Sequence, residues 1–92
     1  MKIILTEVFR KNVAGLGEAE RASVFEVLLA LPKALGDPHR HGGAGLRKLH
    51  VSGIWEARVG LGLRIVFGYQ SGELTLVRCG NHDEVRRFLK DL

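Results

Sequence analysis

The chain has 92 residues, enough for one hydrophobic core and too few for two, so we expect a single domain over residues 1–92. Hydrophobic residues make up 46% of the chain and charged residues 26%, which excludes a disordered chain and a collagen-like one. The formal net charge is +4, and residues 47–92 carry eight basic against five acidic residues, which is +3 of that total. A basic second half favours an anionic partner such as nucleic acid.

Cys79 is the only cysteine, so the chain can form neither an internal disulfide nor a zinc site built on cysteines, and a reducing cytoplasm fits best. The apolar run at residues 3–5 is far too short for a membrane helix, so we expect no membrane partner. His39 and His41 are spaced for a metal ion, but Asp37 is the only further ligand near them. We therefore expect no metal and no other cofactor.

The first half of the sequence has the pattern of a strand followed by two helices. The strand is expected at residues 2–6 and the helices at 7–16 and 18–31. The second helix is expected to end before Pro32, because a proline cannot continue a helix without a kink. A glycine-rich loop follows at residues 36–45. The buried stripe of the second helix is expected to be Ala22, Phe25, Leu28 and Leu29.

After this loop the hydrophobic period changes from 3.6 to 2, which predicts strands at residues 46–51, 54–59, 63–69 and 73–79. A last helix begins near Asn81, which can cap it. The sequence thus predicts an α+β fold in the order β-α-α-β-β-β-β-α. We expect a mostly antiparallel, twisted β-sheet with helices packed on one face. Two of these helices are N-terminal, and the third is a short C-terminal helix. The buried stripe of the last helix is expected to be Val85, Phe88, Leu89 and Leu92.

The central hairpin places basic side chains on the face opposite the core. A three-residue turn at 60–62 sets Arg58 directly across from Arg64. A similar turn at 70–72 sets Arg78 across from Arg64 as the third member of a row, whereas a two-residue turn at 71–72 would shift Arg78 to the other face. The first pairing gathers the apolar side chains of the hairpin on one face: Trp55, Ala57, Val59, Leu63, Ile65 and Phe67.

Neighbouring arginines on a sheet favour an anionic ligand. Like charges directly opposite each other destabilise strand pairing, and guanidinium groups match the oxygens of a phosphate. The alternative is that these arginines are solvated, with Glu56 on the same face as a partner.

Two histidines are candidates for acid–base chemistry. His82 lies at the first turn of the last helix, where the positive end of the helix dipole disfavours the protonated ring and leaves a proton acceptor. The alternative is a surface or capping histidine. His50 lies near Arg47 and Lys48, and is either part of the site or a plain surface residue. Cys79 is expected beside the core as an inert buried thiol.

Four stretches together resemble one known group of proteins. They are Leu46-Arg47-Lys48-Leu49, Gly53 to Val59, Leu63 to Phe67, and Arg78-Cys79-Gly80-Asn81-His82. In these stretches, and in element order over essentially its whole length, the chain resembles the RelE/ParE superfamily of toxins from type II toxin–antitoxin systems. The last stretch looks most like the YafQ-like mRNA interferase branch.

The resemblance implies a small, metal-independent endoribonuclease, a hydrolase that binds and cuts mRNA, commonly on the ribosome, and so inhibits translation. A cognate antitoxin would block it in a toxin–antitoxin hetero-oligomer in the cytoplasm. The resemblance assigns catalysis to His82, with Arg58 and Arg78 stabilising the phosphate and Arg64 in support. The middle hairpin departs from the YafQ-like pattern, because residues 60–62 replace the histidine and aspartate of that group. The expected substrate-binding residues are Arg47, Lys48, His50 and Arg86.

The expected reaction is attack of a ribose 2′-OH on the adjacent phosphorus, with His82 or His50 as the base. One rival is a ParE-like inhibitor that binds DNA gyrase and performs no chemistry, since one fold can carry several functions. Another is a nuclease-dead member of the fold that binds only RNA or the antitoxin.

Overall fold

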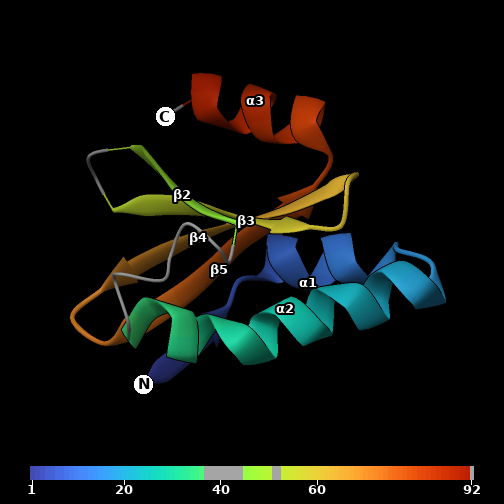
Figure 1. Cartoon of the computed structure of the whole chain (residues 1–92). Helices are drawn as coiled ribbons and strands as arrows, with labels where there is room; N and C mark the ends of the chain where they lie inside the picture. Colours follow the sequence, from blue (N-terminus) through green and yellow to red (C-terminus); the bar gives the residue numbers. More distant parts are fainter. Residues whose placement is uncertain (37–44, 51–52, 92) are drawn as a thin grey trace.

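The computed structural model describes residues 1–36, 45–50 and 53–91, with the side chain of residue 50 left out. Residues 37–44 of the glycine-rich loop predicted at 36–45, including the histidine pair, therefore lie outside the described residues, while Gly36 belongs to a helix. In the described ranges the chain forms eight elements in the predicted order (Figure 1). They are β1 (Lys2–Leu5), α1 (Glu7–Ala14), α2 (Glu18–Gly36), β2 (Leu46–His50), β3 (Ile54–Val59), β4 (Leu63–Gln70), β5 (Glu73–Gly80) and α3 (His82–Lys90).

The strands form one sheet in the order β1-β5-β4-β3-β2. β1 runs parallel to β5, and the other neighbours are antiparallel, which confirms the predicted α+β class. Helices α1 and α2 cover one face of this sheet, whereas α3 lies on the other side (Figure 1). The expectation that all the helices pack on one face is therefore wrong for α3. The face opposite α1 and α2 is called the open face below.

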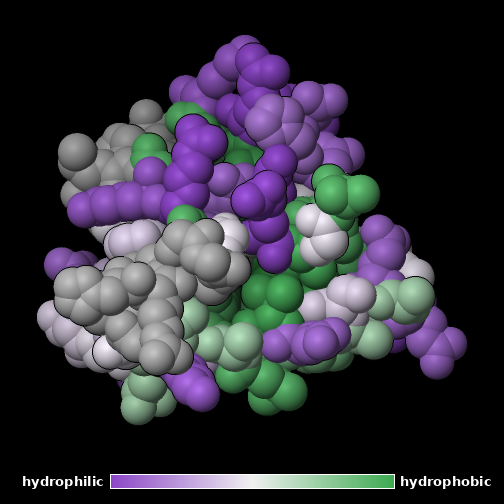
Figure 2. Space-filling view, viewed as in Figure 1, coloured by the Kyte–Doolittle hydropathy of each residue, from purple (hydrophilic) through white to green (hydrophobic). Residues whose placement is uncertain are grey.

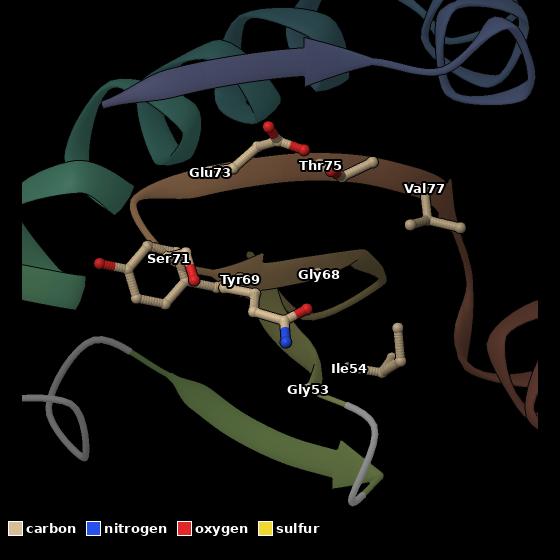
Figure 3. A pocket seen from close by; sticks show the side chains of 9 residues that line it. Gly53, Ile54, Gly68, Tyr69, Ser71, Glu73, Thr75 and Val77 are labelled. Carbon is tan, nitrogen blue, oxygen red and sulfur yellow. The ribbon is translucent and has the colours of Figure 1, made fainter.

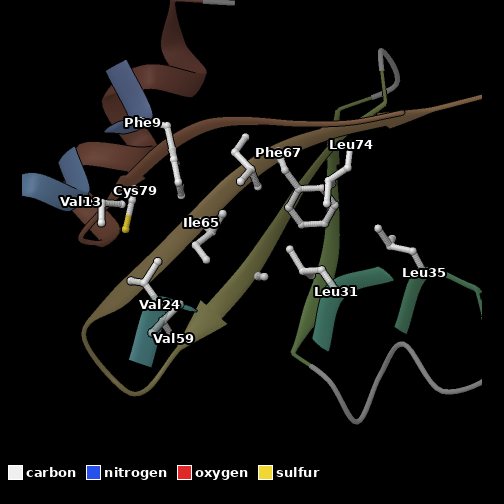
Figure 4. Packing of buried hydrophobic residues seen from close by; sticks show 12 residues of the cluster. Phe9, Val13, Val24, Leu31, Leu35, Val59, Ile65, Phe67, Leu74 and Cys79 are labelled. Carbon is white, nitrogen blue, oxygen red and sulfur yellow. The ribbon is translucent and has the colours of Figure 1, made fainter. Parts of the chain in front are cut away.

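The core lies between the sheet and the two N-terminal helices, and Figure 4 shows its side chains meeting there. From α2 the buried residues are Val24, Leu31 and Leu35, while Phe25 is 49% exposed and Leu29 84% exposed. The predicted stripe of α2 is therefore wrong for Ala22, Phe25 and Leu29, whereas Leu28 does pack against the core. The difference arises because this helix has a second apolar stripe at helical spacing. Hydrophobic surface remains visible at the level of α2 (Figure 2).

Pro32 lies inside α2, so the predicted end of this helix at residue 31 is also wrong. The helix continues to Gly36 because Leu31 and Leu35, on either side of the proline, are both anchored in the core. Their burial offsets the backbone hydrogen bond that the proline ring removes.

The pairing of β3 with β4 is the predicted one. Val59 lies opposite Leu63 and Arg58 opposite Arg64. Ala57, Val59, Ile65 and Phe67 are buried on the core side of this hairpin, and Trp55 and Leu63 pack against them.

The pairing of β4 with β5 differs from the predicted one. Gln70 lies opposite Glu73, so the turn has two residues, Ser71 and Gly72, and both have positive φ angles of 51° and 75° as a type I′ turn requires. The register then shifts by one residue at Val77, since Phe67 pairs with Leu76 and Val66 pairs with Arg78. This β-bulge returns Arg78 to the open face, opposite Val66 instead of Arg64.

Thr6, the N-cap of α1, and Asn12 of α1 hold this bulge through side-chain hydrogen bonds to β5, next to the pairing of β1 with β5. The Thr6 hydroxyl donates to the carbonyl oxygens of Leu76 and Val77 at 2.9 and 3.1 Å. The hydroxyl oxygen of Thr6 also accepts the backbone N–H of Phe9 at 3.2 Å and so caps α1. Asn12 Oδ1 accepts the backbone N–H of Cys79 at 3.1 Å, on the far side of the bulge.

Replacing Thr6 by valine keeps the shape of the side chain and deletes these hydrogen bonds. We expect Thr6→Val to lower the free energy of unfolding by about 1–2 kcal/mol, the range for a lost helix cap. Urea unfolding followed by circular dichroism measures the change. Ser23→Ala is the matched control, because the exposed Ser23 hydroxyl only donates to the carbonyl of Ala19 inside α2. Equal stability of the two variants would contradict the role given to Thr6.

Candidate functional site

A cleft of about 400 Å³ opens on the open face where β2, β3, β4 and the start of α3 meet. It brings together four of the residues predicted for the site, from four different elements. Hydrophilic side chains gather over this upper part of the molecule (Figure 2). The polar side chains that line the cleft are Arg47, Glu56, Arg58, Arg64 and His82, and Gly45 lies beside them.

Arg58 and Arg64 lie on neighbouring strands with their Cα atoms paired across the ladder. The side chain of Arg58 is exposed, and its backbone N–H donates to the carbonyl of Gly45 at 3.3 Å. Gly45 has a φ angle of 71°, and a Cβ there would lie 3.5 Å from that of Arg58. The distance is an ordinary contact, so it is the positive φ angle that favours glycine at position 45.

Arg64 is held by an ion pair with Glu56. Its Nε atom lies 3.0 Å from Oε1 of Glu56, whose side chain is only 9% exposed, against 22% for Arg64. The buried Nε–H is not aligned for a hydrogen bond, so the contact is ionic and short without being fully satisfied. The alternative that Glu56 partners the arginines is thus confirmed for Arg64. Sequence reasoning named Glu56 only as a partner and missed its place in the cleft.

His82 is the first residue of α3, and the residues around it explain that position. Asn81 caps the helix, since its side chain accepts the N–H of Glu84 at 2.9 Å and Oε1 of Glu84 accepts the N–H of Asn81 at 3.0 Å. A Cβ at Gly80 would lie 3.1 Å from that of Glu84, so a side chain at position 80 would push Glu84 away. Gly80 and Asn81 therefore start α3 at the predicted place, and the exposed His82 side chain lines the cleft.

Arg78 lies on the same face as the cleft but does not line it. Its guanidinium carbon lies 4.8 Å from the ring centre of Phe88 on α3, a cation–π contact. Phe88 is only half-buried, so its predicted place in the core is wrong, and Val85 is the one fully buried residue of α3 in its described range. The row of three arginines is therefore a directly opposed pair, Arg58 and Arg64, with Arg78 diagonal to it.

The other predicted substrate-binding residues are more scattered. Lys48 pairs with Trp55, whose side chain packs on the core, so this register turns Lys48 away from the face that carries Arg47. Arg86 is exposed on α3 and does not line the cleft. For His50 only the backbone is described, and it pairs with Ile54.

No family model and no curated protein matches this sequence. Solved structures do match it, over nearly the whole chain. YafQ from E. coli superposes with a TM-score of 0.73 at 15% identity, covering 91% of this chain and 96% of that one. The chain has the fold of the RelE/ParE toxins. An archaeal RelE–RelB complex from Pyrococcus horikoshii gives a TM-score of 0.67 at 15% identity, with 87% and 92% covered. A YoeB/ParE toxin from Agrobacterium tumefaciens gives 0.65 at 21% identity, with 89% and 99% covered.

These matches confirm the fold that the sequence resemblance implied. A RelE/ParE-type fold can carry several activities and does not by itself choose one. In the described ranges no helix is long and apolar enough to span a membrane. The same ranges hold no group of three histidine, cysteine or acidic residues placed to bind a metal ion. The predicted metal-spaced pair, His39 and His41, lies outside them.

Cys79 faces the core of this RelE-like fold and is 4% exposed. Burial raises the pKa of the Cys79 thiol from 9.0 to about 11, and the carboxylates of Glu20 and Glu84 add to the shift because they repel a thiolate. The thiol is therefore protonated at neutral pH, which agrees with the inert role predicted for it.

Alkylation of Cys79 should be slow in the native protein. At about pH 8 the thiolate fraction is about 100-fold smaller than in the unfolded chain, because the pKa is higher by two units in the folded state. The rate of iodoacetamide labelling, measured by mass spectrometry in buffer and in concentrated urea, gives this ratio. The unfolded chain loses the thiol proton near pH 9.0, whereas the folded protein keeps it up to about pH 11. The contribution of Cys79 to the free energy of unfolding is therefore complete below pH 9.0 and is lost as the pH rises through about 11. Equal labelling rates in the two states would contradict the burial of this thiol.

Proposed function

We propose that this protein is the toxin of a type II toxin–antitoxin pair and acts as a metal-independent endoribonuclease on mRNA. The observation that carries the proposal is the cleft, in which His82 meets Arg58 and Arg64 on the open face of a RelE-type sheet. Cleavage of RNA by its own ribose 2′-OH needs a group that takes a proton and cations that stabilise the phosphate. A histidine beside two guanidinium groups supplies both.

In the proposed reaction His82 takes the proton from a ribose 2′-OH. The freed oxygen attacks the adjacent phosphorus, and the 5′ oxygen of the next nucleotide leaves with a proton from water. The products are a 2′,3′-cyclic phosphate and a free 5′-OH end. DNA cannot react in this way because it lacks the 2′-OH.

The arginines stabilise the extra negative charge on the phosphorus in the transition state. Arg58 and Arg64 face each other across the ladder, so an anion between them also removes their mutual repulsion. Glu56 orients Arg64 through the 3.0 Å ion pair. Arg47 is exposed at the rim of the cleft and holds the RNA backbone through a salt-dependent contact. Arg78, fixed against Phe88, attracts the flanking phosphate, while the register removes Lys48 from the proposed RNA contacts.

A protein antitoxin is the proposed partner, by analogy with the complex of RelE with RelB, and it would neutralise the toxin in a cytoplasmic hetero-oligomer. The basic open face favours an acidic or amphipathic segment of that partner, which would cover the cleft. Cleavage on the ribosome is the proposed route by which the toxin stops translation.

Induced expression of the wild type and of His82→Ala tests the nuclease. We expect growth arrest and new mRNA 5′ ends with the wild type and neither with His82→Ala, because the variant cannot deprotonate the 2′-OH. Primer extension maps the ends. Arg87→Ala, an exposed charge on α3 outside the cleft, is the matched control and should cut normally. Arrest without cuts would favour the gyrase inhibitor, and cutting by His82→Ala would overturn the assignment of the base.

Arg58→Ala tests the electrostatic part of the mechanism. The variant should cleave a short RNA about 10²- to 10³-fold more slowly, the usual loss when one transition-state donor is removed. Single-turnover rates with purified protein measure this loss, and Arg87→Ala serves as a control of the same charge on α3, at a residue that does not line the cleft. A rate for Arg58→Ala within a few-fold of wild type would show that Arg58 does not contact the reacting phosphate.

A further inference from the structure

A second hollow lies on the same open face, toward the other end of the sheet, with a volume of about 470 Å³. Figure 3 shows Ile54 and Val77 at one end of it and Ser71 and Glu73 at the other, with Thr75 between them on β5. Gly68 of β4 forms its floor. This hollow is called the Gly68 pocket below.

Nothing in the fold requires a glycine at position 68. Gly68 lies in the central strand, paired with Ile54 on one side and Thr75 on the other, where a glycine weakens a sheet. Its φ angle is not in the positive range, and a Cβ there would be 3.9 Å from its nearest neighbours, which is ordinary contact. A glycine in a strand interior marks a bulge, a bend, or the close approach of a ligand or of another backbone. Gly68 itself is regularly paired, since the bulge lies between Val66 and Phe67, and no backbone atom comes closer than 3.9 Å to its Cβ position, which leaves the approach of a ligand. The missing side chain is what opens the pocket.

The chemistry of the lining suits a flat, uncharged ring with polar edges. Ile54 and Val77 offer apolar surface beside the bare backbone of Gly68, while Thr75, Ser71 and Glu73 offer donors and acceptors. The described lining contains no Lys or Arg, so the pocket does not suit a phosphate. A nucleobase has apolar faces and hydrogen-bonding edges, and unstacked bases of single-stranded RNA are read in such hollows.

The pocket is aligned with the cleft. The pairs Arg58–Arg64, Glu56–Val66 and Ile54–Gly68 follow one another on this face. Ile54 is four residues from Arg58 along β3, which is about 13 Å at the usual rise of a strand. One or two nucleotides of extended RNA span this distance, so a strand cut at His82 would pass directly over the Gly68 pocket.

We propose that the Gly68 pocket is a nucleobase subsite, which takes an unstacked base one or two nucleotides from the phosphate cut in the cleft. The inference rests on the proposed function, because it needs RNA to lie on this face. It assigns sequence preference to the pocket and leaves the chemical step to the cleft.

Gly68→Val tests the proposal, because it fills the pocket while a β-branched residue suits the strand. We expect a native stability equal to or above that of the wild type by urea unfolding. Mapped mRNA ends should show cutting with an altered base preference at one position near the cut. Gly62→Val is the matched control in the turn between β3 and β4, where Gly62 has no heavy atom near its Cβ position and no positive φ. Unchanged cut positions and rates in Gly68→Val would overturn the proposal.

A binding measurement separates this inference from the nuclease proposal. Short single-stranded RNA carrying the fluorescent base 2-aminopurine is titrated into His82→Ala and into His82→Ala/Gly68→Val. We expect at least a tenfold weaker affinity in the double variant, equivalent to about 1.4 kcal/mol or more, because the valine side chain occupies the space of the base. If the wild type binds RNA at Gly68 but never cuts it, the nuclease fails and the subsite stands. Equal affinities of the two variants for RNA would overturn the subsite. It would also be overturned if Gly68→Val cut RNA as the wild type does and had lost only the binding of its antitoxin.

Discussion

The hydrogen bonds from Thr6 and Asn12 to β5 are the interactions on which the open face depends. The two-residue turn after β4 sets a register in which residue 78 would point into the core. Burying an arginine there without a partner would cost several kcal/mol, on the order of a buried charge. The bulge at Val77 removes this conflict, and the Thr6 hydroxyl satisfies its extra carbonyl. The start of α1 therefore decides which side chains of β5 reach the open face and where α3 begins.

The same bulge explains why α3 leaves the core side. After it, Cys79 faces the core and Gly80 faces outward opposite Arg64, so the chain enters α3 from the open side of the sheet. Phe88 then packs on Arg78 instead of on the core. The apolar stripe of α3 is thus used against an arginine, and the helix is fixed with His82 at the cleft.

The cleft is held at an energetic cost that a purely structural sheet would avoid. Arg58 and Arg64 repel each other across the ladder, and Glu56 is buried to compensate only one of them. The Nε–H of Arg64 is buried without an aligned acceptor, and its 3.0 Å ion pair with Glu56 offsets only part of that cost. Local conflicts of this kind concentrate at functional sites, because the geometry there is set by a ligand as well as by the fold.

The sequence predicts some parts of this structure well, and the reason differs from element to element. The register of β3 with β4 follows from alternation on both strands, because a slip by one residue would bury Arg58 and Arg64. The turn at Ser71 is ambiguous in the sequence, and the bulge depends on Thr6, about seventy residues earlier, so neither Arg78's partner nor its face follows from local pattern. On α2, apolar residues occupy two stripes, and only packing against the sheet selects Val24 over Phe25. The position of His82 at the start of α3 does follow from the sequence, because Asn81 and Glu84 carry a capping signal that is entirely local.

The open face divides its chemistry along the strands. The cleft end carries cations around one histidine, and the other end carries a bare glycine with apolar and polar neighbours and one carboxylate, Glu73. The pair Glu56 and Val66 lies between them on this face and is buried, so it separates the cleft from the Gly68 pocket. Cations alone would attract any polyanion without regard to sequence, since phosphate contacts carry no information about bases. A glycine in the central strand that neither packing nor backbone conformation requires is what turns this charged face into one able to choose where it binds.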